Sequence, residues 1–467
     1  MPPKVALAIV VGFTLYLLAW DRKQSREVAW TAWLPTLWVL YLGSRPISRW
    51  FVLGEAGGGS DDGSPMDRIF LSFLILISLM ILASRKLQWS VIMREQRWLF
   101  ALVLFAGISC LWSAEPYIAL KRWVRVLGCL LIALVIATES SPEEALLAVL
   151  RRTAYILVPL SVVLIKYFGD YGRDYDRWAG KTMWVGVSTQ KNSLGILCSM
   201  SALFLIWSFA RRWTRKQLKW FSRPTMAELL VFGCTLWILR GPEQSYSATA
   251  ALGLMAGLFI YFALTRMARR GNPLSPKLIM AVAFIMVLFG IAVPLSGGGQ
   301  LFSGLFSMFG RDITFTGRTD IWAKVLPFAW QHPFLGTGYG SFWLNPPLPP
   351  PFNTLTHAHN GYLDVFLQLG AVGVVLVIVC VLGFFSNAIA GYARNPEWGA
   401  FAIALLFVLL LHDITEVSFI RASYLWTIIG LFAVLLPGLK EPEDNVVSDW
   451  YEPEDPVKPE AGFPTSA

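Results

Sequence analysis

Three of the four histidines of this sequence lie in one polar stretch, residues 311–369, of an otherwise very apolar chain. His357 and His359 directly precede a new apolar segment. A neutral imidazole is the side chain that most readily accepts a proton near neutral pH. These histidines are therefore candidates for a general base, and Asn360 and Asp364 are close enough to orient the ring or a substrate. His332 precedes a proline, which is typical of a turn residue.

The pair His357 and His359 has two other interpretations. Histidines two residues apart on an extended chain point the same way and can share a metal ion. A third ligand would then come from His332, Asp364 or a more distant segment, but the sequence shows no closed ligand set. Alternatively, both rings only anchor the loop. We expect no metal and no other cofactor.

Basic side chains form the second group of candidates. An arginine can hold phosphate oxygens through two parallel hydrogen bonds, and several on one face of a membrane would suit a diphosphate. The alternative is that each of them contacts lipid headgroups or caps the end of a helix. The candidates are Arg318, Arg311, Arg240 and Lys191, the last of them within TQKNSLG at 189–195.

A third group, His412, Asp413 and Glu416, lies at the end of another apolar segment. Ionisable groups at membrane depth are costly and usually face a pore or an active cavity. This set fits a proton-coupled secondary transporter, or a structural pair that supports the polar stretch. Against the transporter, the sequence shows no paired broken helices in corresponding halves.

The elements that must position these residues are membrane helices. The chain has 467 residues, of which 55% are hydrophobic and 15% charged, whereas soluble domains have about 25% charged residues. We predict an all-α fold, a polytopic membrane helical bundle of about 12–13 transmembrane helices with one large external loop. The apolar cores are 5–20, 28–43, 68–84, 98–113, 122–138, 147–166, 188–210, 226–240, 246–265, 278–295, 361–388, 398–414 and 422–438.

Loop charge predicts the orientation. Two strongly basic loops, residues 211–223 and 265–270, lie two spans apart and fit the cytoplasmic side. The large loop at 296–360 then falls outside. The predicted domains are a transmembrane domain at 1–439 and a disordered, acidic cytoplasmic tail at 440–467.

The large loop is expected to contain a short amphipathic helix from Asp320 to Gln331. Thr319 would cap its start, and Pro333 would stop it. Because its apolar residues gather on one side, the helix would either lie flat on the outer leaflet or pack on the bundle.

Several classes of function are excluded. The chain carries no Walker, Rossmann or other ATP-binding signature, so the energy for a reaction must arrive in the substrate or from a gradient. It has no basic stripe interleaved with stacking aromatics, so nucleic acid is not an expected partner. The five cysteines lie in or beside apolar runs without CxxC spacing and are expected to be packed thiols.

Four ordered motifs connect these residues to a known family. With them, the chain resembles the O-antigen ligase and polymerase superfamily of bacterial inner membranes, the Wzy-type proteins. It is most similar to their exopolysaccharide-polymerase branch. The motifs are TQKNSLG (189–195), GRTDIW (317–322), HPFLGTGYGSF (332–342) and HAHNGYLDVFLQLGAVG (357–373).

The resemblance implies a metal-independent glycosyltransferase that moves a glycan from undecaprenyl diphosphate to an acceptor hydroxyl on the periplasmic face. It implies that His359 is the essential histidine and that Arg318 contacts the diphosphate. An arginine that commonly follows a serine in the family is replaced here by Ala248, so Arg240 or Lys191 would supply that contact. The remaining substrate-binding candidates are Arg311, His357 and Asn360.

The implied partners are the lipid bilayer, the lipid-linked glycan, an acceptor glycan, and proteins that regulate chain length or export the polymer. A polymerase and a ligase share this chemistry and differ in the acceptor that they admit. The motifs do not separate the two, and they do not identify the sugar or the linkage.

Overall fold

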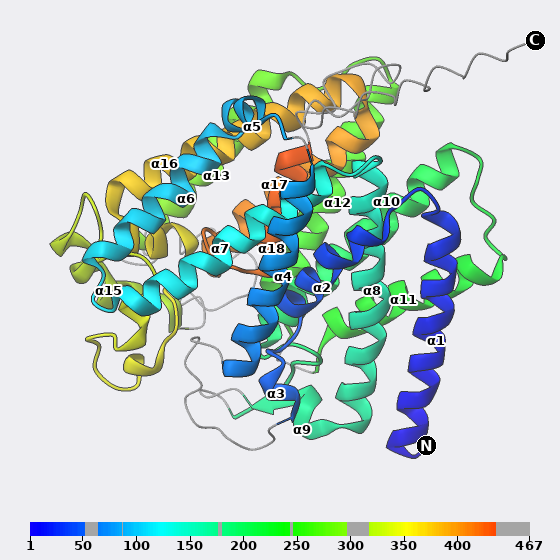
Figure 1. The fold of residues 1–467 in the computed structure, drawn as a ribbon, viewed down its shortest axis with the longest axis horizontal. Coiled ribbons are helices and arrows are strands. Elements are labelled where there is room, and N and C mark those ends of the chain that lie inside the picture. The colour runs from blue at the N-terminus through cyan, green and yellow to red at the C-terminus, as the bar shows by residue number, and fades with distance from the viewer. Residues whose placement is uncertain (52–63, 86, 176–179, 243–245, 297–316, 436–467) are drawn as a thin grey trace, which may run out of the picture.

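The computed structural model describes residues 1–51, 64–85, 87–175, 180–242, 246–296 and 317–435. Arg311 and the tail at 440–467 lie outside the described residues. Figure 1 shows the described helices gathered into one bundle, with α1 and α15 on opposite sides of it. The helices are α1 (Pro3–Gln24), α2 (Trp33–Gly43), α3 (Ser48–Phe51), α4 (Pro65–Ser84), α5 (Trp89–Glu95), α6 (Arg97–Ser109), α7 (Pro116–Ala137), α8 (Pro142–Tyr167), α9 (Gly169–Gly172), α10 (Lys191–Thr214), α11 (Arg223–Arg240), α12 (Ala248–Arg269), α13 (Pro276–Leu295), α15 (Arg318–Gln331), α16 (Gly361–Arg394), α17 (Pro396–Thr415) and α18 (Tyr424–Leu435).

The all-α polytopic fold is confirmed. Every apolar core predicted from the sequence overlaps a helix of the bundle. Among the described residues, eight helices are long and apolar enough to cross a membrane: α1, α4, α8, α10, α12, α13, α16 and α17. The other cores correspond to shorter or more charged helices, among them α6 and α18. A small antiparallel hairpin, β1 (Arg173–Tyr175) with β2 (Thr182–Trp184), is the sheet within the described part of the chain.

Helix α17 is the centre of the bundle. It packs against α12, α13, α16 and α18, and 89% of its most apolar window is buried, compared with 11% for α1. The peripheral helices turn large apolar side chains outward, as membrane helices do where they face lipid. The C-terminal end of α17 is therefore a fixed point on which the surrounding segments can converge.

Helix α16 is not the single uninterrupted span that the sequence predicts. Its backbone breaks at Gly370, which has a φ of 62°. The apolar pattern continues through the break, so the sequence gives no sign of it. Beyond the break, the helix continues from residue 371 to Arg394 as an apolar segment of the bundle.

The glycine-rich turn of the polar stretch fills the break in α16. Backbone N–H groups of Thr337 and Gly338 donate to the carbonyls of Leu367 and Gln368, each at 3.0 Å. In the other direction, the Ala371 N–H donates to the Pro333 carbonyl at 2.8 Å. Backbone groups that the helix leaves unpaired at its break are thus satisfied by the turn. The turn is thereby fixed against the helix that follows the two histidines.

Helix α15 starts earlier than predicted and has a different cap. Its N-cap is Gly317, with a φ of 82°, and its first residue is Arg318, so Thr319 lies inside the helix. Trp322 and Val325 are fully buried, and the helix packs on α13 and α16. The sequence leaves two placements open for this helix, flat on the outer leaflet or packed on the bundle. The contacts of α15 with α13 and α16 show the second. This placement directs the first turn of α15 toward the start of α16.

The contact between the turn and the helix break yields a stability prediction. In Gly370→Ala, the new Cβ would lie 2.3 Å from the backbone carbonyl of Phe334, at a φ that L-residues rarely adopt. Strain of this kind costs about 1–3 kcal/mol. We expect the melting temperature of the detergent-purified protein to fall by several degrees. Gly12→Ala, with nothing within 4 Å of the added carbon, is the matched control. Equal melting temperatures for the two variants would contradict the proposed role of the break.

Candidate functional site

The two histidines before α16 lie side by side at one end of the bundle, with their ring planes tilted by 48°. The ring centroids of His357 and His359 are 4.1 Å apart. The His357 side chain is 9% exposed and that of His359 is 24% exposed. His359 has a φ of 50°, in the left-handed region. A non-glycine residue holds this conformation only where its surroundings fix the backbone, as happens at functional sites.

The peptide between the two histidines is clamped from both sides. The Ala358 N–H donates to Asp364 Oδ1 at 3.1 Å, and its carbonyl accepts from Trp322 Nε1 at 2.9 Å. Asp364 also accepts from Trp343 Nε1 at 2.8 Å and from Gln368 Nε2 at 2.6 Å. Asp364 therefore positions the histidine loop from α16, while Trp322 positions it from α15.

Asn360 is a structural anchor of the same loop. It is fully buried and caps α16, with Oδ1 accepting from the Leu363 N–H at 2.8 Å. Its Nδ2 donates to the carbonyls of Gly290 in α13, at 3.2 Å, and Ile414 in α17, at 3.0 Å. These bonds use both atoms of the amide, so its geometry serves the placement of the loop.

Both histidines face the carboxylate of Glu416, at the C-terminal end of α17. Glu416 Oε2 lies 3.5 Å from His357 Nε2 and 3.6 Å from His359 Nδ1. Glu416 Oε1 accepts hydrogen bonds from Arg318 Nη2 at 2.6 Å and from Asn192 Nδ2 at 2.5 Å. Three of the recognised motifs thus converge on one carboxylate that belongs to none of them.

Electrostatics keep this carboxylate ionised. Burial alone would raise the pKa of Glu416, but His359, His357 and Arg318 together hold it well below its usual value. Burial, followed by the neighbouring His359, lowers the pKa of His357 to about 4. His357 is therefore neutral at neutral pH, and Arg318, in an ion pair at 2.6 Å, supplies a permanent counter-charge to Glu416.

Lys191 and Arg240 are the two other basic candidates. Lys191 is the first residue of α10 and lines a small depression with Tyr246 and Ser247. Arg240 is exposed at the end of α11, next to Gly241 on the rim of the same depression. The structure thus brings Lys191 next to the polar cluster and leaves Arg240 at the surface beyond it.

Although Ala248 replaces the arginine expected from the family pattern, its segment still borders the site. Ser247 Oγ donates to Asn192 Oδ1 at 2.9 Å. Thr249 Oγ1 and Thr415 Oγ1 are 2.8 Å apart, which ties the start of α12 to the end of α17. A positive charge is missing here, but the polar connection to Glu416 through Asn192 remains.

Sequence reasoning names Glu416 only together with His412 and Asp413, and it does not name Arg421. In the structure, the Glu416 carboxylate points to the histidines. Asp413 Oδ1 instead accepts the backbone N–H groups of Ser418 and Phe419, at 2.7 and 3.1 Å. Arg421, in the loop thus supported, donates from Nη2 to the Thr356 carbonyl at 3.5 Å. The sequence signal for Glu416 is its position at the end of an apolar segment, next to an expected external loop. No sequence pattern singles out Arg421.

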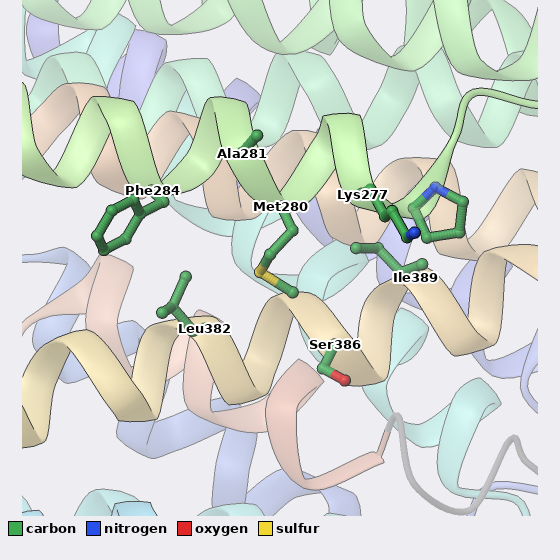
Figure 2. A pocket seen from close by; sticks show the side chains of 8 residues that line it. Lys277, Met280, Ala281, Phe284, Leu382, Ser386 and Ile389 are labelled. Atoms are coloured by element: carbon green, nitrogen blue, oxygen red, sulfur yellow. The ribbon is translucent and has the colours of Figure 1, made fainter.

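An apolar groove is a separate feature of the described structure. It has a volume of about 520 Å³ and lies between α13 and α16. Figure 2 shows Met280, Phe284 and Leu382 along it and Lys277 at one end. Its lining is almost entirely apolar and includes none of the residues of the histidine cluster. It fits a surface in contact with lipid and does not fit a site for polar chemistry.

If the two histidines shared a metal ion, Glu416 would be the third ligand that the sequence left open. Among the described residues, His357, His359 and Glu416 offer ligand atoms within 4.8 Å of one another. His332 is exposed at the end of α15, and Asp364 is occupied by its hydrogen bonds. The arrangement could hold a cation by geometry, but the guanidinium of Arg318 already compensates the single carboxylate. A second cation beside Arg318 would be electrostatically unfavourable.

Comparison with known proteins confirms the resemblance. Residues 244–378 match the O-antigen ligase family, Wzy_C. The chain is 29% identical over 328 residues to the exopolysaccharide production protein ExoQ of Rhizobium meliloti (strain 1021), covering 67% of this chain and 70% of that protein. The segment that matches the family contains Arg318, His357 and His359, whereas Lys191 and Glu416 lie outside it.

The anchoring role of Asn360 can be tested by its effect on stability. Asn360→Ala removes a helix cap, worth about 0.5–2 kcal/mol, and leaves two buried carbonyls without their donor. We expect a clear fall in melting temperature in detergent. Asn353→Ala changes an exposed asparagine of the same stretch and should melt like the unmodified protein. If Asn360→Ala melts at the same temperature as this control, the amide does not anchor the loop.

Proposed function

We propose that this protein is a glycosyltransferase of the bacterial inner membrane in exopolysaccharide or O-antigen synthesis. It transfers a glycan from undecaprenyl diphosphate to an acceptor hydroxyl on the periplasmic face, as a polymerase or a ligase. The matches to the O-antigen ligase family and to ExoQ support the class of function. The observation that carries the proposal is the convergence of Arg318 and His359 on the same carboxylate.

The chemistry needs a base and a group that stabilises the leaving diphosphate. The acceptor oxygen bonds to the anomeric carbon, and the bond from that carbon to phosphate breaks with its electron pair on the diphosphate. His359 takes the acceptor proton, and Arg318 stabilises the charge on the leaving group. Because the carrier-linked sugar is already activated, no nucleotide site is required.

The distribution of basic residues supports the proposed orientation. Helices α10 and α12 both start beside the polar cluster, at Lys191 and Ala248. Their last turns carry Arg211 and Arg212, and Arg266 and Arg269. Loops rich in Arg and Lys favour the cytoplasm, so the histidine end of the bundle is assigned to the periplasm.

Loss of the base is expected to abolish polymer formation. In a deletion strain that carries His359→Ala, we expect no long-chain polysaccharide, accumulation of lipid-linked glycan, and a normal amount of protein in the membrane. A base of this kind contributes about 100- to 10,000-fold to the rate. The matched control is His332→Ala, because His332 is exposed outside the cluster. Normal polymer from the His359→Ala strain would contradict the proposal.

We propose that the reaction requires no metal, because Arg318 already balances Glu416. The purified enzyme should retain its rate of glycan transfer after treatment with EDTA. Divalent cations restored after this treatment should not raise that rate. Loss of activity with EDTA and recovery with a single metal would assign His357, His359 and Glu416 to a metal site instead.

A further inference from the structure

Glu416 is placed where a helix does not favour a carboxylate. It follows Thr415 directly at the C-terminal end of α17, and its own N–H donates to the His412 carbonyl at 2.8 Å. The C-terminal end of a helix carries a partial negative charge, so an anionic side chain there is unfavourable for the helix. The side chain is also 7% exposed. An unfavourable position and a costly burial together indicate a role beyond stabilising α17.

The two oxygens of this carboxylate have separate partners. Oε1 accepts from Arg318 and from Asn192. Oε2 faces the ring nitrogens of His357 and His359. A single rigid group therefore fixes the arginine on one side and the histidine pair on the other.

One nitrogen of the His359 ring faces Glu416, and part of the side chain is exposed to solvent. Its Nδ1 is buried, and within the described part of the chain no group lies within hydrogen-bond distance of it. Glu416 Oε2, at 3.6 Å, is close enough to accept from Nδ1–H after a shift of about half an ångström. The exposed 24% of the side chain belongs to atoms other than Nδ1.

We propose that Glu416 is a positioning residue that holds His359 with Nδ1–H toward the carboxylate and Nε2 toward the acceptor hydroxyl. This inference rests on the proposed glycan transfer. As the new glycosidic bond forms, the acceptor proton passes to Nε2, and the electron pair of the broken bond stays on the diphosphate. Glu416 then stabilises the imidazolium across Nδ1–H, and the proton leaves to solvent with the products.

An alternative role for Glu416 predicts a different effect on kcat and KM. Glu416 could occupy the place of the diphosphate between Arg318 and the histidines, and be displaced by the substrate. Its removal would then strengthen binding of the donor and lower its KM. The positioning role acts on the transition state, so its removal lowers kcat.

The test measures kcat and KM for Glu416→Gln with lipid-linked glycan extracted from the deletion strain. The glutamine keeps the size of the side chain and its carbonyl oxygen but removes the charge. We expect kcat to fall by about tenfold to 1,000-fold, within the range that a general base supplies, while the KM for the donor changes by less than about threefold. Glu416→Asp restores the charge on a side chain shorter by one methylene, so it should recover part of the lost kcat but not all of it.

The matched control is Glu397→Gln at the other end of α17. Glu397 pairs with the exposed Arg269 at 3.3 Å, and its loss should leave both constants unchanged. Unchanged kcat in Glu416→Gln, or a lower KM, would overturn the inference. If the glutamine variant cannot be purified, Glu416→Asp decides alone. Its carboxylate is withdrawn by one methylene, so an unchanged kcat would contradict positioning.

The two proposals can fail separately. If His359→Ala is inactive and Glu416→Gln retains full kcat, the glycan transfer stands and only the role of Glu416 is wrong. If His359→Ala retains its polymer, the proposed base itself is wrong. Melting temperatures of the variants separate both results from a loss of folding.

Discussion

The arrangement of the site depends on one buried negative charge. Removing a carboxylate from water costs several kcal/mol unless a counter-charge and hydrogen bonds compensate it. Glu416 meets this requirement with Arg318 from α15, Asn192 from α10 and the histidines before α16. Each of these partners comes from a different segment, so the neutralisation of one carboxylate brings three parts of the chain to the end of α17. The ion pair that stabilises the fold here also assembles the candidate chemistry.

The helix ends around this carboxylate have a common polarity. Helices α10, α12, α15 and α16 start at or beside the cluster, at Lys191, Ala248, Arg318 and Gly361. The N-terminal end of a helix carries a partial positive charge and unpaired N–H groups. Together with the basic side chains, this polarity suits a doubly charged phosphate group. Ala248, where the family pattern has an arginine, therefore removes only one of several sources of positive electrostatic potential at this site.

The limits of sequence reasoning follow from the range of the interactions. Apolar runs are local, so each predicted core corresponds to a helix, and the short motifs around Arg318 and His359 identified residues that the fold brings together. Glu416 could not be placed from local pattern, because its partners Asn192 and Arg318 are 224 and 98 positions away. The break at Gly370 was equally hidden, since the turn that satisfies its backbone comes from residues 333–338, on another segment.

The structure also separates a group that the sequence joins. His412, Asp413 and Glu416 lie within five positions and, as a set, favour a proton pathway. Asp413 directs Oδ1 to the backbone N–H groups of Ser418 and Phe419, while Glu416 turns to the histidines. A relay needs side chains that exchange protons with one another, but these two carboxylates accept from different partners. The end of α17 therefore carries a structural acid that shapes the loop and, three residues later, an acid directed into the site. Neighbours in sequence serve different functions because the helix end presents them to different surroundings.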